Sequence, residues 1–571
     1  MLDQFEDLLG APLPAEPPAS QMVPAGAGGE RAMGAFDGAD RYNTSLAAWA
    51  PTMGSADLDV IPSKQLSDAR VRDMVRNDAY VQGGAQLQKN NIVGSQYLLN
   101  SKPSSVAVFG KVDEDFEAAF QEEVEELFHI AADSPKNYFD SAGRNTFTDL
   151  VRLATGLHVM TGEVLATVEW KKDGRPFSTA IQMVDTDRLS TPTTFPNIGD
   201  QNIRAGIKRD GSGRPISYFI RAGHPNDYYT PFFNMMAQWV EVPVEKPWGR
   251  TQVIHIFNQL RPDQTRGIAA MTAALKEMHI THRFRDVTLQ NAVTQALYAA
   301  AITSDLPSET VFQSLGGGQM TPEAIQKAIG DYAVGYFGTI DEFAGSAKNL
   351  HVDGVRIPHL MPGTKLEMIS PSSGGPLGME FEASLLRYIA KTLDVSYEQL
   401  SGDYSKTNYS SARAAMVETW KAMQALKIEV ADRFATEVFR LWLEEMINAD
   451  MLKTFPAAKA SLLYTNGRQN LAFDGLARCD WIGAARGQID ELKETQADVL
   501  KLNNGLITRE EVIGKSGKDW RKVFRQLGRE KKLADSIGLQ FAAADPSMMN
   551  AVGGGAQPTN SPNPDGGKVA K

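Results

Sequence analysis

The sequence predicts a multidomain α+β protein that is mainly helical, and three observations support this fold class. Its 571 residues exceed what one hydrophobic core organises, and at roughly 150 residues per domain they suggest three or four folding units. Apolar residues make up 42% and charged residues 22%, as in ordinary folded chains. Apolar residues recur at helical spacing over most of the chain and at strand spacing between residues 157 and 257.

Helical periodicity covers residues 62–98, 113–127, 267–301, 379–393 and 410–447, and returns after residue 476. The helix ending near Ile447 spans roughly 50 Å at 1.5 Å per residue, and we expect Ser410 or Ser411 to cap it. We expect its apolar stripe to be buried core. The stripe consists of Met416, Trp420, Met423, Val430, Phe434, Val438 and Leu441. Capping boxes at Ser396/Gln399 and Thr508/Glu511 mark further helix starts.

β-branched and aromatic residues concentrate in residues 157–170, 179–184, 216–221 and 253–257, which we predict to be strands. A smaller α/β module is expected over residues 305–371, with a helix that opens at Thr321-Pro322. The run Gly316–Gly318 there predicts a flexible turn, because it lacks a nucleotide-loop context. Ala, Pro and Gly dominate residues 1–44 and 545–571, which we expect to be disordered.

The net charge of −11 disfavours a protein that grips phosphate backbones, although it is compatible with a surface that DNA slides past. No apolar run approaches the roughly 18 residues of a membrane span, so we expect a soluble protein. The N-terminus lacks a secretory signal pattern, and Cys479 is the single cysteine. A reducing cytoplasm is the expected place of synthesis.

A basic run lies between residues 515 and 532, with Trp520, Phe524 and Leu527 on the opposite helix face. The basic residues are Lys515, Lys518, Arg521, Lys522, Arg525, Arg529, Lys531 and Lys532, against Asp519 and Glu530. Such a run is either a solvated face or a contact surface for DNA or an acidic partner. The candidate contact residues are Lys518, Arg521, Lys522, Arg525, Arg529 and Lys532.

Signatures of enzymatic chemistry are missing from the sequence. Gly514-Lys515-Ser516 resembles the end of a P-loop, but Arg509 occupies the position of its first glycine. Nucleophile-elbow and zinc-protease motifs are absent. His279 and His282 share a helix face without a third ligand at suitable spacing. We therefore expect no catalytic residues, no metal and no cofactor.

Three ordered sequence blocks resemble the portal proteins of lambda-like tailed phages. The first is Leu260-Arg261-Pro262-Asp263-Gln264-Thr265-Arg266-Gly267. The second is Val395-Ser396-Tyr397-Glu398-Gln399-Leu400-Ser401, followed by Tyr409-Ser410-Ser411-Ala412-Arg413. The third is Trp481-Ile482-Gly483 with Ile489-Asp490-Glu491-Leu492-Lys493-Glu494. No block of comparable specificity lies in residues 1–40 or 100–250.

The resemblance implies a portal fold that assembles into a ring, commonly of twelve subunits, around a channel. It implies a wing over residues 45–266, stem helices over 267–301 and 376–400, a clip over 302–375 and a tunnel loop over 401–411. A long wing helix and following segment would span 412–475, and a helical crown region 476–544. The DNA-facing loop residues would be Asp403, Tyr404, Ser405, Lys406, Thr407 and Asn408.

The resemblance also implies a virion protein at one capsid vertex, assembled in the host bacterial cytoplasm, that serves as a conduit for DNA and nucleates head assembly. Its expected partners are further copies of itself, terminase, the major capsid protein and scaffold, head-completion or tail connector proteins, and double-stranded DNA without sequence specificity. No membrane partner is expected. The alternatives are an enzymatic packaging component, terminase-like or protease-like, and an inactive prophage scaffold.

Overall fold

The computed structural model describes residues 48–49, 51–193, 200, 202–225, 238–298, 377–487 and 491–539, with short pieces between 327 and 357. The chain divides into two compact units, residues 1–54 and 55–571, and every element below belongs to the second. The predicted disordered ends lie outside the described residues. So does most of the predicted 305–371 module, from which a few helical residues between 327 and 335 and the hairpin of β9 (Leu350–Val352) and β10 (Val355–Ile357) are described.

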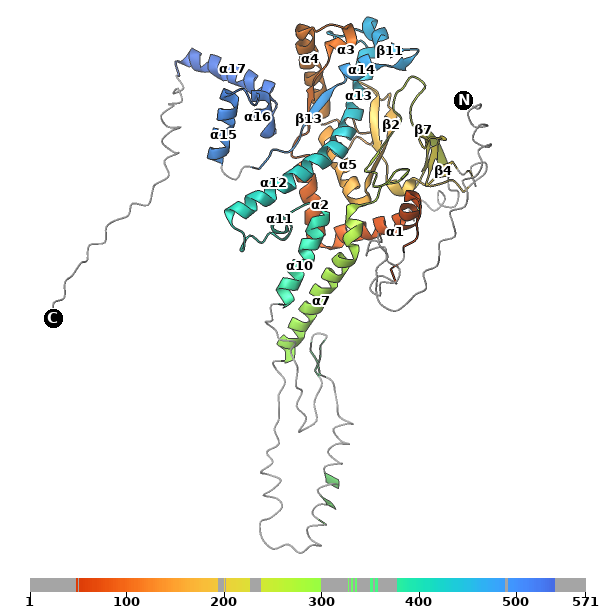
Figure 1. Ribbon diagram of the computed structural model, residues 1–571, viewed down its shortest axis with the longest axis vertical. Helices are drawn as coiled ribbons and strands as arrows, with labels where there is room; N and C mark the ends of the chain where they lie inside the picture. The colour runs from red at the N-terminus through yellow and green to blue at the C-terminus, as the bar shows by residue number, and fades with distance from the viewer. Residues whose placement is uncertain are drawn as a thin grey trace, which may run out of the picture. The chain divides into compact units, whose positions relative to one another are not determined.

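The N-terminal half of the second unit is built from helices that precede two antiparallel sheets (Figure 1). The helices are α1 (Ala56–Asn77), α2 (Ala79–Ile92), α3 (Ser105–Phe109), α4 (Glu114–Ala132) and α5 (Phe147–Thr161). One sheet has the order β3-β2-β8, from β2 (Glu163–Trp170), β3 (Thr179–Met183) and β8 (Val253–Phe257). The other has the order β4-β5-β6-β7, from β4 (Ile203–Arg204), β5 (Ile207–Arg209), β6 (Pro215–Arg221) and β7 (Trp239–Pro243).

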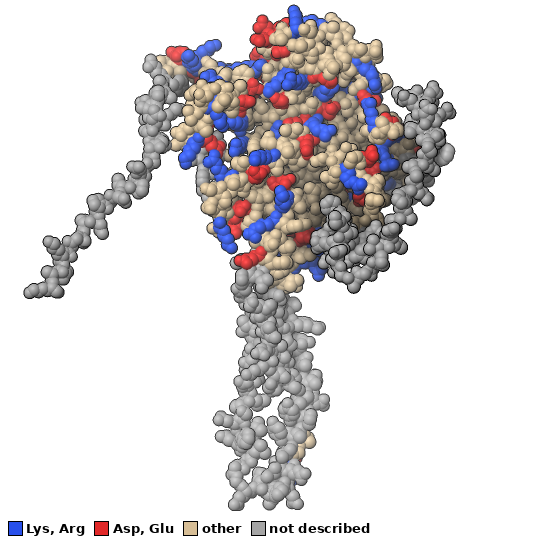
Figure 2. Space-filling view, in the orientation of Figure 1, with Lys and Arg blue, Asp and Glu red and all other residues tan. Residues whose placement is uncertain are grey.

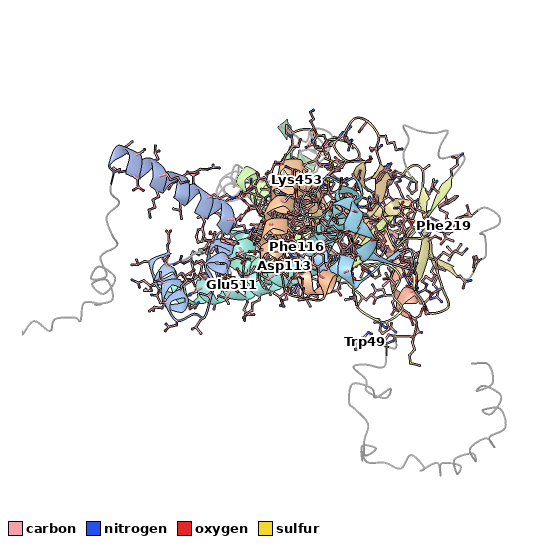
Figure 3. All side chains as sticks on the ribbon, turned by 90° about the horizontal axis from the view of Figure 1, so that it is seen from above. Trp49, Asp113, Phe116, Phe219, Lys453 and Glu511 are labelled. Atoms are coloured by element: carbon pink, nitrogen blue, oxygen red, sulfur yellow. The ribbon has the colours of Figure 1, made fainter. Side chains whose placement is uncertain are left out.

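An aromatic cluster forms the centre of the main core. Phe128 of α4 contacts the rings of Phe147, Trp442 and Trp481, at centroid distances of 5.0, 5.2 and 5.8 Å. Edge-to-face and tilted contacts of this kind add to the stabilisation that burial of the rings provides. A second cluster, which includes Leu165, lies between the two sheets. Figure 3 labels Phe219 on the four-stranded sheet and Phe116 on α4.

A buried polar node lies beside this core, at the start of β2. The Glu163 side chain is fully buried and accepts hydrogen bonds from Arg266 Nη2 at 2.5 Å and from the Gly267 N–H at 3.0 Å. Lys64 Nζ lies 3.3 Å and His255 Nε2 3.2 Å from the same carboxylate. Burial alone would raise the pKa of Glu163, but Arg266, His255 and Lys64 hold it well below its usual range. The node therefore contains a buried charge that its partners compensate.

The long helix expected over 410–447 is present, with a π-helical turn in its middle. It consists of α12 (Tyr409–Leu426), the π turn Lys427–Asp432 and α13 (Arg433–Asn448). The predicted stripe is buried at Met423, Val430, Phe434, Val438 and Leu441, whereas Met416 and Trp420 are half-buried. Inside the turn, Lys427 Nζ lies 2.8 Å from Asp432 and donates to the Trp481 carbonyl, and Tyr97 donates to Asp432. Polar contacts thus fix the π turn to the body.

Two helices run side by side away from the body, α7 (Leu275–Tyr298) and α10 (Leu377–Thr392) (Figure 1). Arg285 Nε donates to Glu382 at 2.6 Å, and the Phe284 ring meets Phe381 edge-on at 5.5 Å. Arg285 also stacks over Tyr80 and lies 3.6 Å from Asp78, the residue that caps α2. One guanidinium therefore joins both helices to α2. No helix in the described ranges is long and apolar enough to cross a membrane.

The remaining elements follow α13. They are a 3₁₀ helix (Ala457–Leu463), β11 (Tyr464–Thr465), β12 (Arg468–Gln469), α14 (Leu471–Leu476) and β13 (Cys479–Ile482). The segment at Lys453 and Thr454 donates backbone hydrogen bonds to Glu123 of α4, near Phe116 and Asp113 (Figure 3). The last helices are α15 (Glu491–Asn503), α16 (Arg509–Lys515) and α17 (Trp520–Ile537). Both predicted capping boxes are confirmed, at Ser396 and Thr508.

Several predicted boundaries were wrong because tertiary contacts decide them. The strand predicted from residue 157 begins at Glu163, since a Thr146/Asp149 capping box starts helix α5 and Gly162, at φ 74°, ends it. The helix predicted from 267 begins at Leu275, after a 3₁₀ turn at Ala270–Ala274. Gly267 is held against the Gly162 carbonyl, where a Cβ would not fit.

Two further boundaries differ from the predictions. The periodic segment 62–98 divides at Asp78 into α1 and α2, and Pro62 lies inside α1 rather than at its start. The predicted helical region from residue 476 begins with β13, which pairs antiparallel with β1 (Leu98–Ser101). Trp481 places this strand in the main core, because its ring stacks on Tyr97 at 5.6 Å. The three C-terminal helices start only at residue 491.

Substitution of Arg266 by Ala should destabilise the body strongly, because it leaves Glu163 charged and buried with weaker compensation. Loss of one partner of a buried ion pair costs about 3–5 kcal/mol. The free energy of unfolding, measured by urea titration with tryptophan fluorescence, checks this. The control is Arg214→Ala, which removes an ion pair with Glu245 on the surface, worth about 0–1 kcal/mol. Equal losses in the two variants would show that the buried node is not critical.

Candidate functional site

The six residues predicted to face DNA lie together on one loop between α11 (Tyr397–Ser401) and α12. The loop is shorter than predicted, residues 402–408, because Tyr409 already begins α12 and Asn408 rather than Ser410 or Ser411 is its N-cap. The Asn408 side chain accepts a hydrogen bond from Ser411 N–H at 2.8 Å. The first residue, Gly402, has φ 71°, a conformation that favours glycine and ends α11. Helix caps therefore define both ends of the loop.

The anchors of the loop are better packed than the loop itself. The side-chain Oε1 of Gln399 accepts from Ser396 N–H at 3.2 Å and from the Thr419 hydroxyl at 3.1 Å, which ties α11 to α12. Leu400 is buried in the main core. Asp403, Tyr404, Ser405, Lys406 and Asn408 are exposed, and Thr407 is half-buried. A rigid base thus presents an accessible polar loop.

The charges of the loop cancel. Hydrogen bonds from the side chain and backbone of Ser405 lower the pKa of Asp403, so this carboxylate stays ionised at neutral pH beside the Lys406 cation. Small polar groups with no net charge give a polyanion weak contacts that do not depend on sequence. Figure 2 shows that the described surface on one face also intermingles basic and acidic residues. Such a surface offers DNA no strongly adhesive patch.

The candidate basic face of α17 is partly committed to contacts within the chain. Arg521 Nη2 donates to Gln121 of α4 at 2.7 Å, and Arg525 forms ion pairs with Glu122 and Glu126. Lys518, Lys522, Arg529 and Lys532 are exposed. The structure therefore brings two of the six candidates onto the acidic helix α4 and leaves four accessible. The acidic helix lies about 400 positions earlier in the sequence, so no local pattern indicated this contact.

A buried carboxyl group lies under the first turn of α17. Glu125 of α4 accepts hydrogen bonds from Ser101 N–H and from the Gln121 amide, both at 2.8 Å. Burial raises its pKa to about 7, although Gln121, Ser101 and Arg521 act in the opposite direction. Its neighbour His129 is also buried, which lowers the pKa of that imidazole to about 4. The base of α17 thus rests on groups whose charge state responds to pH.

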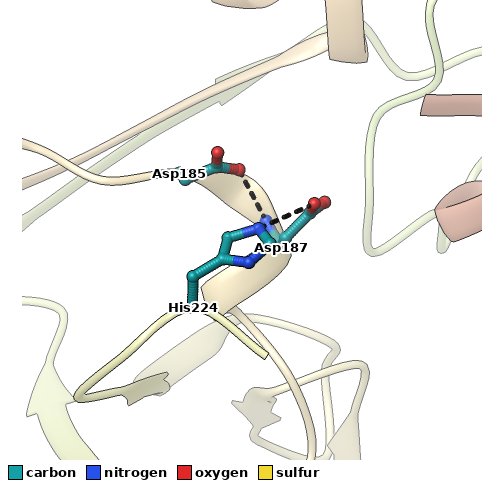
Figure 4. Close-up of side chains that lie close together, drawn as sticks. All are labelled: Asp185, Asp187 and His224. Atoms are coloured by element: carbon teal, nitrogen blue, oxygen red, sulfur yellow. Dashed lines mark hydrogen bonds and ion pairs between the residues drawn. The ribbon is translucent and has the colours of Figure 1, made fainter. Parts of the chain in front are cut away.

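Potential metal ligands lie close together at one place in the described residues, where an arginine side chain pairs with them. Asp185, Asp187 and His224 offer atoms within 4.8 Å of one another (Figure 4). Arg72 lies between the two carboxylates, 2.5 Å from Asp187 and 3.1 Å from Asp185. A metal ion at this place would have to compete with the Arg72 guanidinium for both carboxylates. His279 is exposed, and His282 lies 3.7 Å from Asp78 and Asp286.

The first sequence block has a structural explanation that the sequence did not indicate. The Gln264 side chain accepts from Leu260 N–H at 2.8 Å and donates to the Arg266 carbonyl, so it closes the turn. Thr265 donates to Asp57 of α1, and Arg266 enters the Glu163 node. The block therefore fixes the chain immediately before α7. Its residues position that helix and contribute no group to the exposed loop.

Comparison with known proteins decides the family. The family described as "Phage portal protein, lambda family" matches residues 42–427. The portal protein of Escherichia phage N15 is 33% identical over 539 residues, 94% of this chain and 96% of that protein. Portal protein B of Escherichia phage lambda is 33% identical over 511 residues, 89% of this chain and 91% of its own. The chain belongs to the lambda family of phage portal proteins.

The resemblance that the three blocks indicated is thus confirmed. The family and both relatives are named as portal proteins and not as enzymes, so a terminase-like or protease-like function is not favoured for this chain. A chain in the neck of a native gene transfer agent particle, solved with C12 symmetry, has a TM-score of 0.34 and 13% identity. It covers 82% of this chain and 96% of its own. The family assignment rests on the sequence matches.

Replacement of Glu125 by Gln should change how stability depends on pH. Because the folded pKa is raised, Glu125 favours the folded state below its ordinary pKa of 4.5, and this contribution is lost as the pH rises to about 7. Gln keeps the acceptor oxygen without the charge. The unfolding free energy of the variant minus that of the wild type should therefore rise by about 1–3 kcal/mol between pH 4.5 and pH 8.

Urea unfolding at both pH values measures this difference, and Glu126→Gln on the exposed side of α4 is the control. The control difference should stay within about 0.5 kcal/mol across the same range. A Glu125→Gln difference that is constant with pH would show that the Glu125 carboxyl group titrates normally.

Proposed function

We propose that the portal protein assembles into a ring of identical subunits at one vertex of the capsid, through which DNA is packaged and ejected. The observation that carries this proposal is the 33% identity to two phage portal proteins over about nine tenths of the chain. The exposed, charge-balanced loop on a rigid base supports it, since DNA must slide past such a loop without being held. The number of subunits that we propose is twelve.

In this proposal the parts of the chain have separate roles. The body up to Gly267 is the wing, and α7 and α10 are the stem helices that lead to a clip within residues 302–375. Residues 402–408 are the tunnel loop, α12 and α13 cross the wing, and residues 491–539 belong to the crown. The two stem helices support this division because a single ion pair, Arg285 with Glu382, and one ring contact hold them together as a unit.

The proposed partners follow from these roles. The clip would bind terminase during packaging and head-completion or tail connector proteins afterwards, and the wing would contact the major capsid protein and scaffold. Double-stranded DNA would pass without sequence-specific contacts. ATP hydrolysis would reside in terminase, because the sequence has no P-loop. We further propose that the ring forms in the host cytoplasm before it becomes part of the virion.

Electron microscopy of the purified full-length chain at several concentrations tests the assembly. We expect closed rings with a central hole a few nanometres wide, enough for a DNA duplex. The ring is heterologous, so each subunit contributes two different faces and the assembly closes on itself. A closed oligomer without a channel, or a chain that remains monomeric at every concentration, would contradict the proposal.

Neutralising both loop charges, by Asp403→Asn with Lys406→Gln, should leave ring assembly intact and reduce packaging of DNA by about tenfold or more. Assembly should survive because both side chains are exposed and outside the core. Packaging depends on them if the loop contacts the moving duplex. The measurement is the fraction of DNA-filled heads after complementation of a portal-deficient phage.

A matched pair on the same chain provides the control. Glu418 and Lys421 form an exposed ion pair on α12 at 2.9 Å, and Glu418→Gln with Lys421→Gln removes the same two charges outside the loop. This control should fill heads at the wild-type level. If both double variants fill heads normally, the loop has no part in DNA passage.

A further inference from the structure

The three C-terminal helices bury almost nothing within their own chain. Neither α15 nor α16 contains a buried residue, and between residues 491 and 539 only Asp519 and Ala534 are buried. The same segment exposes many large apolar side chains, Leu492, Leu500, Leu506, Phe524, Leu527, Leu533, Ile537 and Leu539. Apolar side chains in such number are normally covered, because helices of this length gain most of their stability from packing.

Part of this exposed apolar surface lies on one side of α17, which we call the α17 apolar face. Its members are Trp520, Val523, Phe524, Leu527 and Ile537, which recur at helical spacing; Trp520 and Val523 are half-buried and the other three are exposed. Leu527 is 53% and Ile537 66% exposed, and the Phe524 ring, 38% exposed, meets Trp520 edge-on at 5.5 Å. The opposite side of the helix carries the basic residues. The helix is therefore amphipathic, and Phe524, Leu527 and Ile537 on its apolar side remain uncovered in the single chain.

The contacts that α17 makes with the body use its basic side. Arg521 and Arg525 reach Gln121, Glu122 and Glu126 of α4, and these contacts are polar. The α17 apolar face consequently points away from the helix that holds α17 in place. DNA does not fit it, because leucine and phenylalanine side chains offer phosphate groups neither charge nor hydrogen bonds. The occupant must supply apolar side chains.

A complementary surface exists on the same chain, at α15. This helix exposes Leu492 and Leu500, and Leu506 follows its end. Its first turn is acidic, with Glu491 and Glu494. The exposed Lys531 lies at the edge of the α17 apolar face. The two helices therefore offer each other apolar side chains and opposite charges, a lysine on α17 and two glutamates on α15. Within one copy the two surfaces do not cover each other, since both remain exposed.

We propose that the α17 apolar face packs against α15 of a neighbouring copy of this chain. The inference rests on the proposed ring, in which each copy must present two different complementary surfaces. One surface is the α17 apolar face with Lys531, and the other is the leucine side of α15 with its acidic first turn. The contact is head-to-tail, so each subunit uses one surface toward one neighbour and the other surface toward the other neighbour. When the ring is closed, no copy of either surface remains exposed. The basic side of α17 meanwhile stays on α4 of its own subunit.

The test compares two double variants of the full-length chain. Phe524→Ser with Leu527→Ser removes the centre of the α17 apolar face, and Lys522→Ser with Arg529→Ser makes the same number of changes on the basic side. Sedimentation velocity over a range of concentrations measures ring formation. The apolar variant should need at least about tenfold more protein to form rings. Complete burial of one large apolar side chain in an interface raises the affinity by more than about tenfold, and the variant loses two such side chains. The basic variant should assemble within about twofold of wild type.

Circular dichroism verifies that the variants fold, which is expected because all four side chains are exposed or nearly so in the single chain. If the apolar variant forms rings at the same protein concentration as the wild type, this inference is overturned and the proposed function is unaffected. A wild-type chain that never forms rings would overturn both. A third outcome is that the wild-type chain binds phosphatidylglycerol vesicles and the apolar variant does not, while both form rings equally well. That result would assign the face to lipid and also overturn the inference.

Discussion

The position of the turn that leads into α7 depends on the buried Glu163 carboxylate. It brings α1, β2, β8 and the turn before α7 to one point through Lys64, His255 and Arg266. A fully buried charge is tolerated only when its partners are in place, so the four segments are ordered together or not at all. Thr265, which donates to Asp57, adds a second link between the same turn and α1. The turn that precedes α7 is thereby fixed electrostatically to α1 and to the β3-β2-β8 sheet.

Hydrogen bonds and ion pairs connect the protruding helices and the loop to the body, whereas apolar packing stabilises the body itself. Arg285 joins α7 and α10 to Asp78 and Tyr80, Gln399 joins the loop base to α12, and Arg521 and Arg525 join α17 to α4. Hydrogen bonds and ion pairs are directional, so they set the angle at which each element leaves the body. The ring that we propose would need such fixed angles, because an angular error in each subunit would accumulate around the circle.

Local signals were sufficient for much of the fold. Capping boxes at Ser396 and Thr508, the alternating strand Val253–Phe257 and the long helix to Asn448 depend on residues close in sequence, and the sequence predicted each of them. The start of α7 could not be predicted, because the contact of Gly267 with Gly162 decides it across more than 100 residues. The pairing of β13 with β1 links residues about 380 positions apart and had no local signature.

The candidate functional site could likewise be predicted only in part from the sequence. The loop residues Asp403 to Asn408 are contiguous, so a prediction of the loop placed all six together. The predicted loop began one residue too early, at Ser401, and ended too late, at Ser411. The basic residues of α17 were visible as a run, but their division between α4 and solvent depends on the fold. A charge pattern predicts that a face is polar. It does not predict which distant helix neutralises part of that face.

The π turn at Lys427–Asp432 sets the rotation of α12 and the adjoining loop relative to α13. A π turn spaces its hydrogen bonds five residues apart instead of four, so it takes up one residue more than an α turn. One residue corresponds to about 100° of rotation in a 3.6-residue helix. Because α13 is embedded in the core, removal of one residue here would restore an uninterrupted helix and turn α12 about its own axis. The loop at its other end would then present its side chains in a different direction relative to the body, with no change in its own sequence.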